Sequence, residues 1–173
     1  MIVAIDPGIQ GAAAALDSRG SFIDVIDLPT IEVHMCTGKV RKEIDIPAFW
    51  QWLRSVQPKR IIIENVHSFP REGSVGAFRF GVAFGSLHTM AQLHSIYGTK
   101  PELVEPAVWK RYFELLHEEK DESRQLAIAL FPQMAFTHLT RKKDEHRAEA
   151  MLMAWWADRP PVGRNWGASR VAV

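Results

Sequence analysis

The sequence has 173 residues, enough for one domain with its own hydrophobic core. It is 47% hydrophobic and 24% charged, as ordinary globular proteins are, and its net charge of +1 gives no overall attraction to nucleic acid. The single cysteine, Cys36, excludes an internal disulfide and a zinc site built from cysteines. The start of the chain has no signal-peptide pattern, so we expect a reducing, cytoplasmic location.

The first part of the chain predicts a three-stranded meander followed by a helix and a fourth strand. Asp17 to Gly20 is a hairpin turn signal, whereas Pro29 to Glu43 has no clear period and predicts an exposed loop or a short hairpin. A strand, a helix and a further strand in this order imply a crossover and a partly parallel sheet. The predicted elements are strands Ile2–Asp6, Gly11–Leu16, Ser21–Leu28 and Ile61–Glu64, with a helix from Pro47 that ends before Pro58.

The second part predicts mainly helices. Phe80 to Thr99 has no charged residue and is long enough to raise the question of a membrane span, but its His, Gln, Gly and Ser residues favour a buried helix. Glycines at positions 81 and 85 allow that helix to approach a sheet or a partner helix closely. The predicted elements are helices from Ser74 to Tyr97, Pro106 to Phe113, Asp121 to Leu130 and one beginning near Asp144, and a strand over Glu102–Glu105.

Two of the predicted strands end in a carboxylate. Asp6 follows Val3-Ala4-Ile5 and precedes Pro7-Gly8, and Glu64 follows three isoleucines. Neighbouring strands lie about 4.8 Å apart, so two carboxylates there would repel each other unless a cation lies between them. Hard divalent cations with oxygen ligands meet this need. The alternative is that Asp6 caps a turn and Glu64 is an ordinary acid at the end of a strand.

The last predicted helix adds further candidate ligands. His146 and Glu149 are three residues apart and project from one helix face. The following residues, 150 to 156, are nearly all apolar, so the helix should pack inward and carry both side chains toward the sheet. Ordinary capping is the alternative, with Asp144 as the cap or as a partner of His146.

These motifs resemble the RuvC family of Holliday-junction resolvases. The resemblance lies in Ile-Asp-Pro-Gly at Asp6, Ile-Ile-Glu-Asn at Glu64 and His-Arg-Ala-Glu-Ala from His146, in an order that spans Ile2 to about Ala157. It implies an α/β protein with the ribonuclease H-like fold, a mixed five-stranded sheet flanked by helices. We expect residues 1–158 to form this nuclease domain and residues 159–173 to form a C-terminal tail.

The resemblance also implies a metal-dependent endonuclease. Asp6, Glu64 and Glu149 would hold two Mg²⁺ ions, with His146 at a fourth position that is commonly Asp in the family. Imidazole binds Mn²⁺ more readily than Mg²⁺, so His146 could alter metal preference, or it could move a proton from the attacking water. The expected reaction is hydrolysis of phosphodiester bonds in symmetric paired nicks with 5′-phosphate products.

Several residues are candidates for DNA binding. Lys110 and Lys120 fall at positions similar to family lysines that contact DNA near the cut, although solvated surface lysines are the alternative. Phe69, in the loop after Glu64, could stack on an unpaired base, although packing inside the protein would also explain it. The further basic candidates for a phosphate-binding surface are Arg71, Arg79, Arg141, Lys142 and Lys143.

The favoured function is therefore a Mg²⁺-dependent endonuclease that resolves four-way junctions as a homodimer, in the cytoplasm of a bacterium or of the host of a phage. The helix with Gly81 and Gly85 is the candidate dimer seam. One alternative is a nuclease of the same fold that cuts flaps or other branched DNA. Others are a catalytically impaired junction-binding protein and an ATP-handling protein with an actin-like half fold, for which this chain leaves little room.

Overall fold

A computed structural model describes residues 1–66, 73–116 and 120–159 of the chain. Its centre is a mixed five-stranded sheet with the strand order β3-β2-β1-β6-β7. β1 pairs with β2, and β2 with β3, in antiparallel fashion, whereas β1–β6 and β6–β7 are parallel. The strands are β1 (Ile2–Asp6), β2 (Ala12–Leu16), β3 (Phe22–Asp27), β6 (Arg60–Glu64) and β7 (Lys100–Val104).

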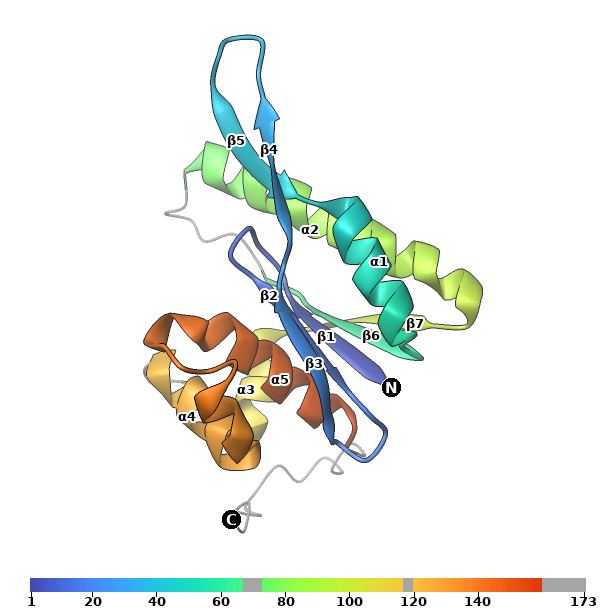
Figure 1. Cartoon of the computed structure of the whole chain (residues 1–173), viewed down its shortest axis with the longest axis vertical. Helices are drawn as coiled ribbons and strands as arrows, with labels where there is room; N and C mark the ends of the chain where they lie inside the picture. The colour runs from blue at the N-terminus through green and yellow to red at the C-terminus, as the bar shows by residue number, and fades with distance from the viewer. Residues whose placement is uncertain (67–72, 117–119, 160–173) are drawn as a thin grey trace.

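Helices cover both faces of this sheet (Figure 1). On one face lie α1 (Ile46–Val56) and α2 (Ser74–His94), and α2 continues into a short 3₁₀ turn over Ser95–Tyr97. The opposite face carries α3 (Pro106–Tyr112), α4 (Lys120–Leu130) and α5 (Glu145–Ala157), with 3₁₀ turns over Pro132–Phe136 and Lys142–Asp144. The ribonuclease H-like fold expected from the resemblance is confirmed.

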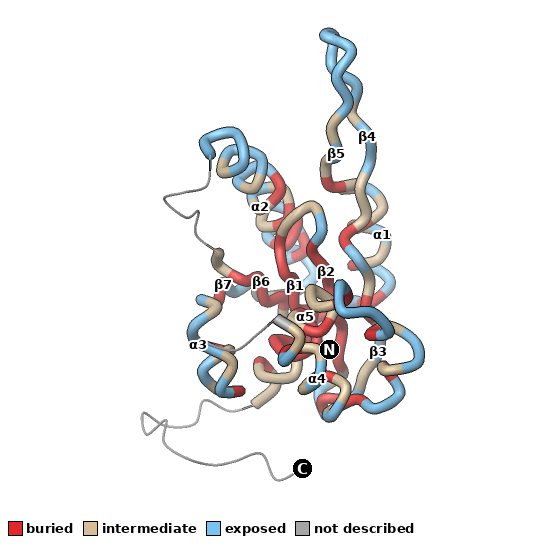
Figure 2. The backbone as a smooth tube through the Cα atoms, turned by 90° about the vertical axis from the view of Figure 1, so that its left-hand side faces the viewer, coloured by how far each residue is buried: buried red, intermediate tan, exposed pale blue. Residues whose placement is uncertain are grey.

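Alternation along the central strands builds two separate cores. Val3 and Ile5 of β1 face the core under α1 and α2, whereas Ile2 and Ala4 face the core under α5. β2 consists of four alanines and a leucine, and small side chains let α5 lie close against it. Figure 2 shows the resulting buried centre, with exposure increasing outward.

A two-stranded arm stands apart from the sheet (Figure 1). β4 (Thr30–His34) pairs with β5 (Val40–Ile44) in antiparallel fashion, which settles the open choice between loop and hairpin in favour of a hairpin. The arm projects beyond the body in Figures 1 and 2, and most of its residues are exposed or half-buried.

The expectation of a buried helix after Phe80 is only half right. Ala83, Leu87 and Met90 of α2 are buried, but Val82 and Leu93 on its other face are exposed. Gly81 and Gly85 also face open space, because a Cβ atom added at either would meet nothing within 4 Å. The glycines therefore do not serve contact with the sheet. No helix among the described residues is long and apolar enough to cross a membrane.

Candidate active site

Two buried carboxylates meet at one edge of the sheet. Asp6 and Glu64 are the last residues of the adjacent parallel strands β1 and β6, where Ile5 is paired with Ile63. Asp6 is only 6% exposed and Glu64 only 5%. Burial raises the pKa of Glu64 to about 7, and the negative charges of Asp6 and Glu149 add to the rise. This edge is therefore short of positive charge.

The turn after β1 is held close over this edge. A Cβ at Gly11 would lie 2.1 Å from the backbone oxygen of Asp6, so only glycine permits this approach. The amide of Gly11 donates to the carbonyl oxygen of Gly8, and the amide of Leu28 donates to Gly11. The turn thus fixes the backbone on which Asp6 is carried.

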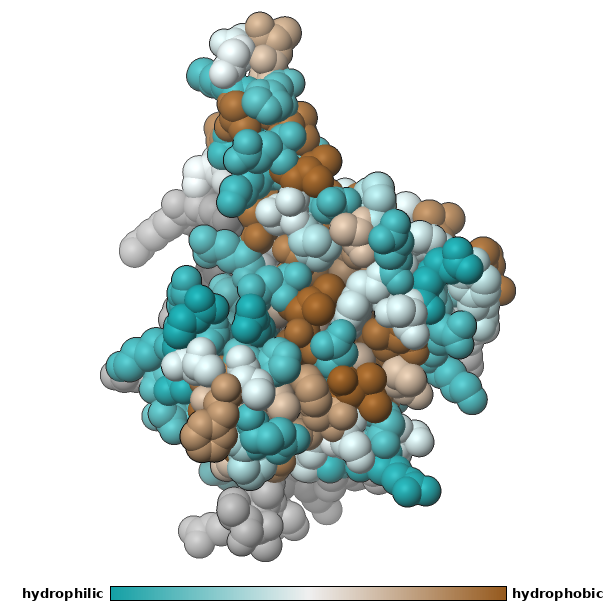
Figure 3. Space-filling model, viewed as in Figure 1, coloured by the Kyte–Doolittle hydropathy of each residue, from teal (hydrophilic) through white to brown (hydrophobic). Residues whose placement is uncertain are grey.

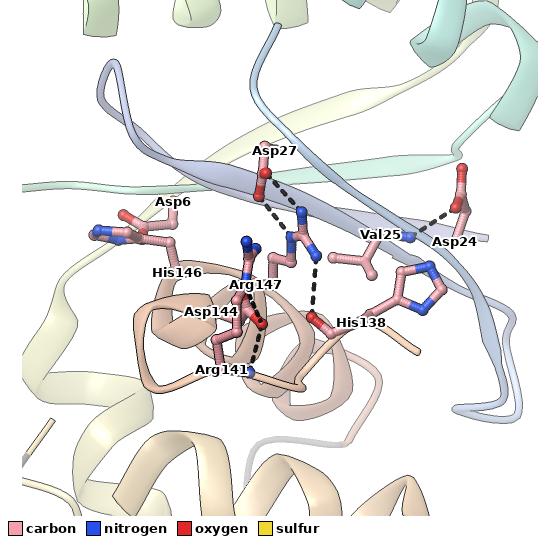
Figure 4. Close-up of polar contacts among 9 residues, drawn as sticks. All are labelled: Asp6, Asp24, Val25, Asp27, His138, Arg141, Asp144, His146 and Arg147. Atoms are coloured by element: carbon pink, nitrogen blue, oxygen red, sulfur yellow. Dashed lines mark hydrogen bonds and ion pairs between the residues drawn. The ribbon is translucent and has the colours of Figure 1, made fainter. Parts of the chain in front are cut away.

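Helix α5 brings His146 onto Asp6. Nδ1 of His146 lies 2.7 Å from Oδ2 of Asp6, and Figure 4 shows the two side chains approaching from helix and strand. This hydrogen bond raises the pKa of His146 above its ordinary value, although burial opposes the rise. Because the carboxylate accepts, Nδ1 carries the proton, and Nε2 of the neutral ring keeps a lone pair.

Glu149 lies one helical turn further along α5 and already has a cationic partner. Nζ of Lys110, on α3, is 2.8 Å from its Oε1, and the hydroxyl of Ser123, on α4, donates to the same oxygen at 3.3 Å. Burial alone would lower the pKa of Lys110, but the charge and hydrogen bond of Glu149 raise it overall. The ammonium group thus neutralises part of the negative charge of the site.

Trp109 reaches the site beside Lys110. Its fully buried indole donates from Nε1 to Oε1 of Glu64 at 2.9 Å. This hydrogen bond opposes the rise in the pKa of Glu64 that burial and neighbouring carboxylates cause. Two consecutive residues of α3 therefore hold two different carboxylates of the site.

Known structures share this arrangement of strands and helices. A structure of Thermus thermophilus RuvC matches with a TM-score of 0.55 at 18% identity, covering 90% of this chain and 91% of that one. A second, T. thermophilus RuvC in complex with a Holliday junction substrate, gives 0.53 at 14% identity, with 90% of each chain covered. The chain has the RuvC fold. No model of a protein family matches the sequence, and neither does any curated protein.

Asp6, Glu64, His146 and Glu149 thus lie at one edge of the RuvC fold, which carries them on β1, β6 and α5. Asp6 is committed to His146 and Glu149 to Lys110. Across the described ranges, no group of three or more His, Cys, Asp or Glu side chains is placed so that it could hold a metal ion as it stands. The donor set is nevertheless rich in carboxylate oxygens and short of positive charge, which is the chemistry that a hard divalent cation requires. A cation would have to displace Lys110 from Glu149.

Asp144 stands at the N-cap position of α5, but its side chain is used elsewhere. Its carboxylate accepts from the backbone amide of Arg141 at 2.8 Å and from Nη2 of the same residue at 2.6 Å. It makes no side-chain cap on α5. This pairing also commits Arg141 to Asp144, so its guanidinium is not a free phosphate ligand (Figure 4).

The structure describes only some of the other residues expected to bind DNA. Arg79 and Lys142 are exposed, and Lys110 is partly exposed at the site. Lys120 begins α4, but its side chain lies outside the described part of the structure. Phe69 and Arg71 fall in 67–72, and most of the expected tail falls in 160–173, which are both outside the described residues.

Sequence reasoning missed the clamp between Asp27 and Arg147. Nε and Nη2 of Arg147 each lie 2.6 Å from a carboxylate oxygen of Asp27, and Nη1 donates to the carbonyl oxygen of His138 (Figure 4). The hydrogen bond from Arg147 lowers the pKa of Asp27. The clamp ties the first turn of α5 to the end of β3, next to the residue that contacts Asp6.

Ser123 and Trp109 were also missed, although Trp109 precedes a lysine that the resemblance does single out. A contact between residues 45 positions apart, as Trp109 and Glu64 are, has no local signal in a sequence.

Proposed function

We propose that this protein is a structure-selective endonuclease that resolves four-way DNA junctions by metal-dependent hydrolysis of phosphodiester bonds. The observation that carries the proposal is the edge where Asp6, Glu64, His146 and Glu149 gather and where burial and like charge raise the pKa of Glu64 to about 7. The RuvC fold supports it, because a RuvC of this fold has been observed with a Holliday junction substrate.

The chain's own residues divide the work of such a site. Asp6, Glu64 and Glu149 would hold the divalent cations, two Mg²⁺ ions in the proposed form, with Mn²⁺ as a substitute. When bound, the cations would activate water and offset charge on the leaving oxygen. His146 keeps Nδ1 on Asp6 and leaves Nε2 for a second ligand or a proton. Trp109 orients Glu64, and Lys110, once released from Glu149, would be available to a DNA phosphate.

A homodimer fits both the substrate and the surface of α2. A junction presents two strands for symmetric cutting, so a twofold protein matches the task. The exposed face of α2 and of the 3₁₀ turn that follows it has a mirror order about residues 85 and 86: Val75 mirrors Ile96, Phe78 mirrors Leu93, and Val82 mirrors Thr89. A twofold axis there would place each residue of a copy against its mirror partner in the second copy, with Gly85 at the crossing.

The experiment that tests the function is cleavage of a labelled synthetic four-way junction beside a matched linear duplex, with Mg²⁺, Mn²⁺ or EDTA. We expect paired nicks in the junction only, with 5′-phosphate ends, and none with EDTA. Asp6→Asn should abolish cleavage and leave junction binding largely intact. Cleavage that survives in Asp6→Asn, or equal cutting of the linear duplex, would contradict the proposal. Three-way and flap substrates, run in parallel, test the broader branched-DNA alternative.

The second candidate is a junction-binding protein without cleavage. The ion pair between Lys110 and Glu149 favours it, because an ammonium group already neutralises one of the expected ligands. His146→Asp separates the two candidates: it should remain active with Mg²⁺ if His146 is a ligand. Binding without cleavage in every metal, by both the wild type and this variant, would favour the second candidate.

A further inference from the structure

The hairpin arm rises from the same edge of the sheet as the candidate active site. Asp6 of β1 is paired with Ala12 of β2, and Ala12 is paired with Asp27, the last residue of β3. The chain then enters β4 at Thr30, and a hydrogen bond from the amide of Asp45 to the carbonyl oxygen of Pro29 closes the base of the arm. The arm therefore points outward from the catalytic edge (Figures 1 and 2).

The outer part of the arm is basic. Between residues 33 and 42 the sequence contains Lys39, Arg41 and Lys42 and no acidic residue. Arg41 forms an ion pair with Glu43 nearer the base. No ion pair among the described residues involves Lys39 or Lys42, although Glu32 is opposite Lys42 in the ladder. Both lysines are exposed and available to an anion.

A cation from the body of the protein joins this basic surface. Arg79, in α2, lines the same cavity of about 490 Å³ as Arg41 and Lys42 of the arm. Apolar residues of the arm base and α2 also line the cavity, and Glu43 is the one acidic residue in its lining. Arg79, a DNA-binding candidate from its sequence alone, thus gains specific neighbours in the structure.

The apolar residues of the arm do not form one surface. In the observed register, Ile31 lies on the face with Glu43, whereas Val40 lies on the opposite face with Lys42, and Met35 is at the tip. Figure 3 shows hydrophilic and hydrophobic side chains interspersed over the visible face of the arm. Singly exposed apolar side chains are ordinary, so charge is the feature that points to a partner.

We propose that the β4–β5 arm binds the phosphate backbone of a duplex arm of the substrate, on the side away from the branch point. A two-stranded ribbon fits the major groove of B-form DNA, which is about 12 Å wide. Five-residue strands would carry Lys39 roughly 16 Å beyond the base of the arm. Lysines contact phosphates as point charges and read no bases, so the contact adds affinity without sequence preference. The inference rests on the proposed function.

The test compares Lys39→Gln/Lys42→Gln with the control Arg19→Gln/Lys59→Gln. The control removes two exposed cations from the opposite edge of the sheet, in the β2–β3 turn and before β6, so the change in net charge is the same. Binding to a four-way junction is measured by titration in EDTA at several salt concentrations. We expect the arm variant to bind several-fold more weakly, with the salt dependence (log of affinity against log of salt concentration) shallower by about two, and the control to match the wild type.

The length of the DNA provides a second readout. When each duplex of the junction is about two helical turns long, the variant Lys39→Gln/Lys42→Gln should bind more weakly than the wild type. When each duplex is about half a turn long, the two proteins should bind alike. Equal binding by the arm variant and the wild type to the long junction would refute the inference. So would loss of dimer mass by the arm variant in sedimentation, which would assign the arm to a second copy. A wild type that does not bind the junction would instead refute the proposed function.

Discussion

The site is built at the residue scale by pairing each of its carboxylates with a specific donor. Asp6 has His146, Glu64 has Trp109, and Glu149 has Lys110. The donors differ in charge, and this difference matters. A neutral indole leaves Glu64 with the least compensation, which is consistent with its raised pKa. Glu64 is therefore the carboxylate that gains most from a bound cation.

The hydrogen bond from Trp109 should stabilise the fold more at high pH than at low pH. Trp109→Phe keeps an aromatic ring but loses the N–H, and a hydrogen bond to an ionised carboxylate contributes about 1.5 to 3 kcal/mol. Since the pKa of Glu64 is about 7, the carboxylate is ionised at pH 8.5 and largely protonated at pH 5.5. We expect the loss of unfolding free energy in this variant to be larger at pH 8.5.

Urea unfolding at the two pH values measures this difference. The smaller ring also leaves a cavity, but the cost of a cavity does not depend on pH and cancels in the comparison. Trp52→Phe is the matched control. The indole of Trp52 also donates to a carboxylate, that of Asp24, at a distance of 2.8 Å, but this pair lies away from the candidate active site. An equal loss at both pH values would show that the Trp109 contact to Glu64 does not respond to the charge of the carboxylate.

At the scale of elements, the sequence predicted most strands and helices to within two residues. The apolar runs of β1 and β6 and the prolines near the start of α1 and α3 are strong local signals. The four ligand candidates were found because Asp6 and Glu64 each end a strand and because His146 and Glu149 share one face near the start of α5. The donors Trp109 and Ser123 and the Asp27–Arg147 clamp were not predicted, because they depend on how α3, α4 and α5 pack against the sheet.

A buried histidine fastens the C-terminal end of α2 to the sheet. The hydroxyl of Thr99 donates to the carbonyl oxygen of Pro58 at 2.7 Å, so Nδ1 of His94, also 2.7 Å away, must donate to Thr99. Burial lowers the pKa of His94 below its ordinary value. The link joins α2, the residue before β7 and the segment before β6, on the side opposite the candidate active site.

This lowered pKa predicts a loss of stability on acidification. The unfolded chain takes up the proton near pH 6.5, before the folded protein does, so the contribution is complete above that pH and falls as the pH drops through the folded value. His94→Asn keeps a donor for Thr99 and removes the titration. We expect the wild type to lose more unfolding free energy than this variant between pH 7.5 and about 5, with a slope of at most about 1.4 kcal/mol per pH unit. Parallel urea titrations measure it, and identical pH profiles would contradict the prediction.

At the scale of the whole molecule, a large apolar surface lacks a partner among the described residues. Along α2, a groove of about 910 Å³ runs beside α1, with Gly81 and Gly85 in its lining. Phe78 on α2 and Ile96 in the 3₁₀ turn that follows it are 68% and 75% exposed. A surface of this extent on a soluble chain is typical of a protein interface. Its mirror order about residues 85 and 86 matches the isologous contact of a twofold dimer.

Phe78→Glu should therefore dissociate the proposed dimer. In the mirror arrangement Phe78 of each copy meets Leu93 of the other, so the substitution buries two unpaired charges and should weaken association by several kcal/mol.

Phe136→Glu is the matched control, because Phe136 is 87% exposed and lies outside α2. Sedimentation velocity should give a dimer for the wild type and the control and a monomer for Phe78→Glu, with the fold kept by circular dichroism. Paired nicking should then give way to single nicks, since one site can cut only one strand at a time. An unchanged mass for Phe78→Glu would remove α2 as the seam.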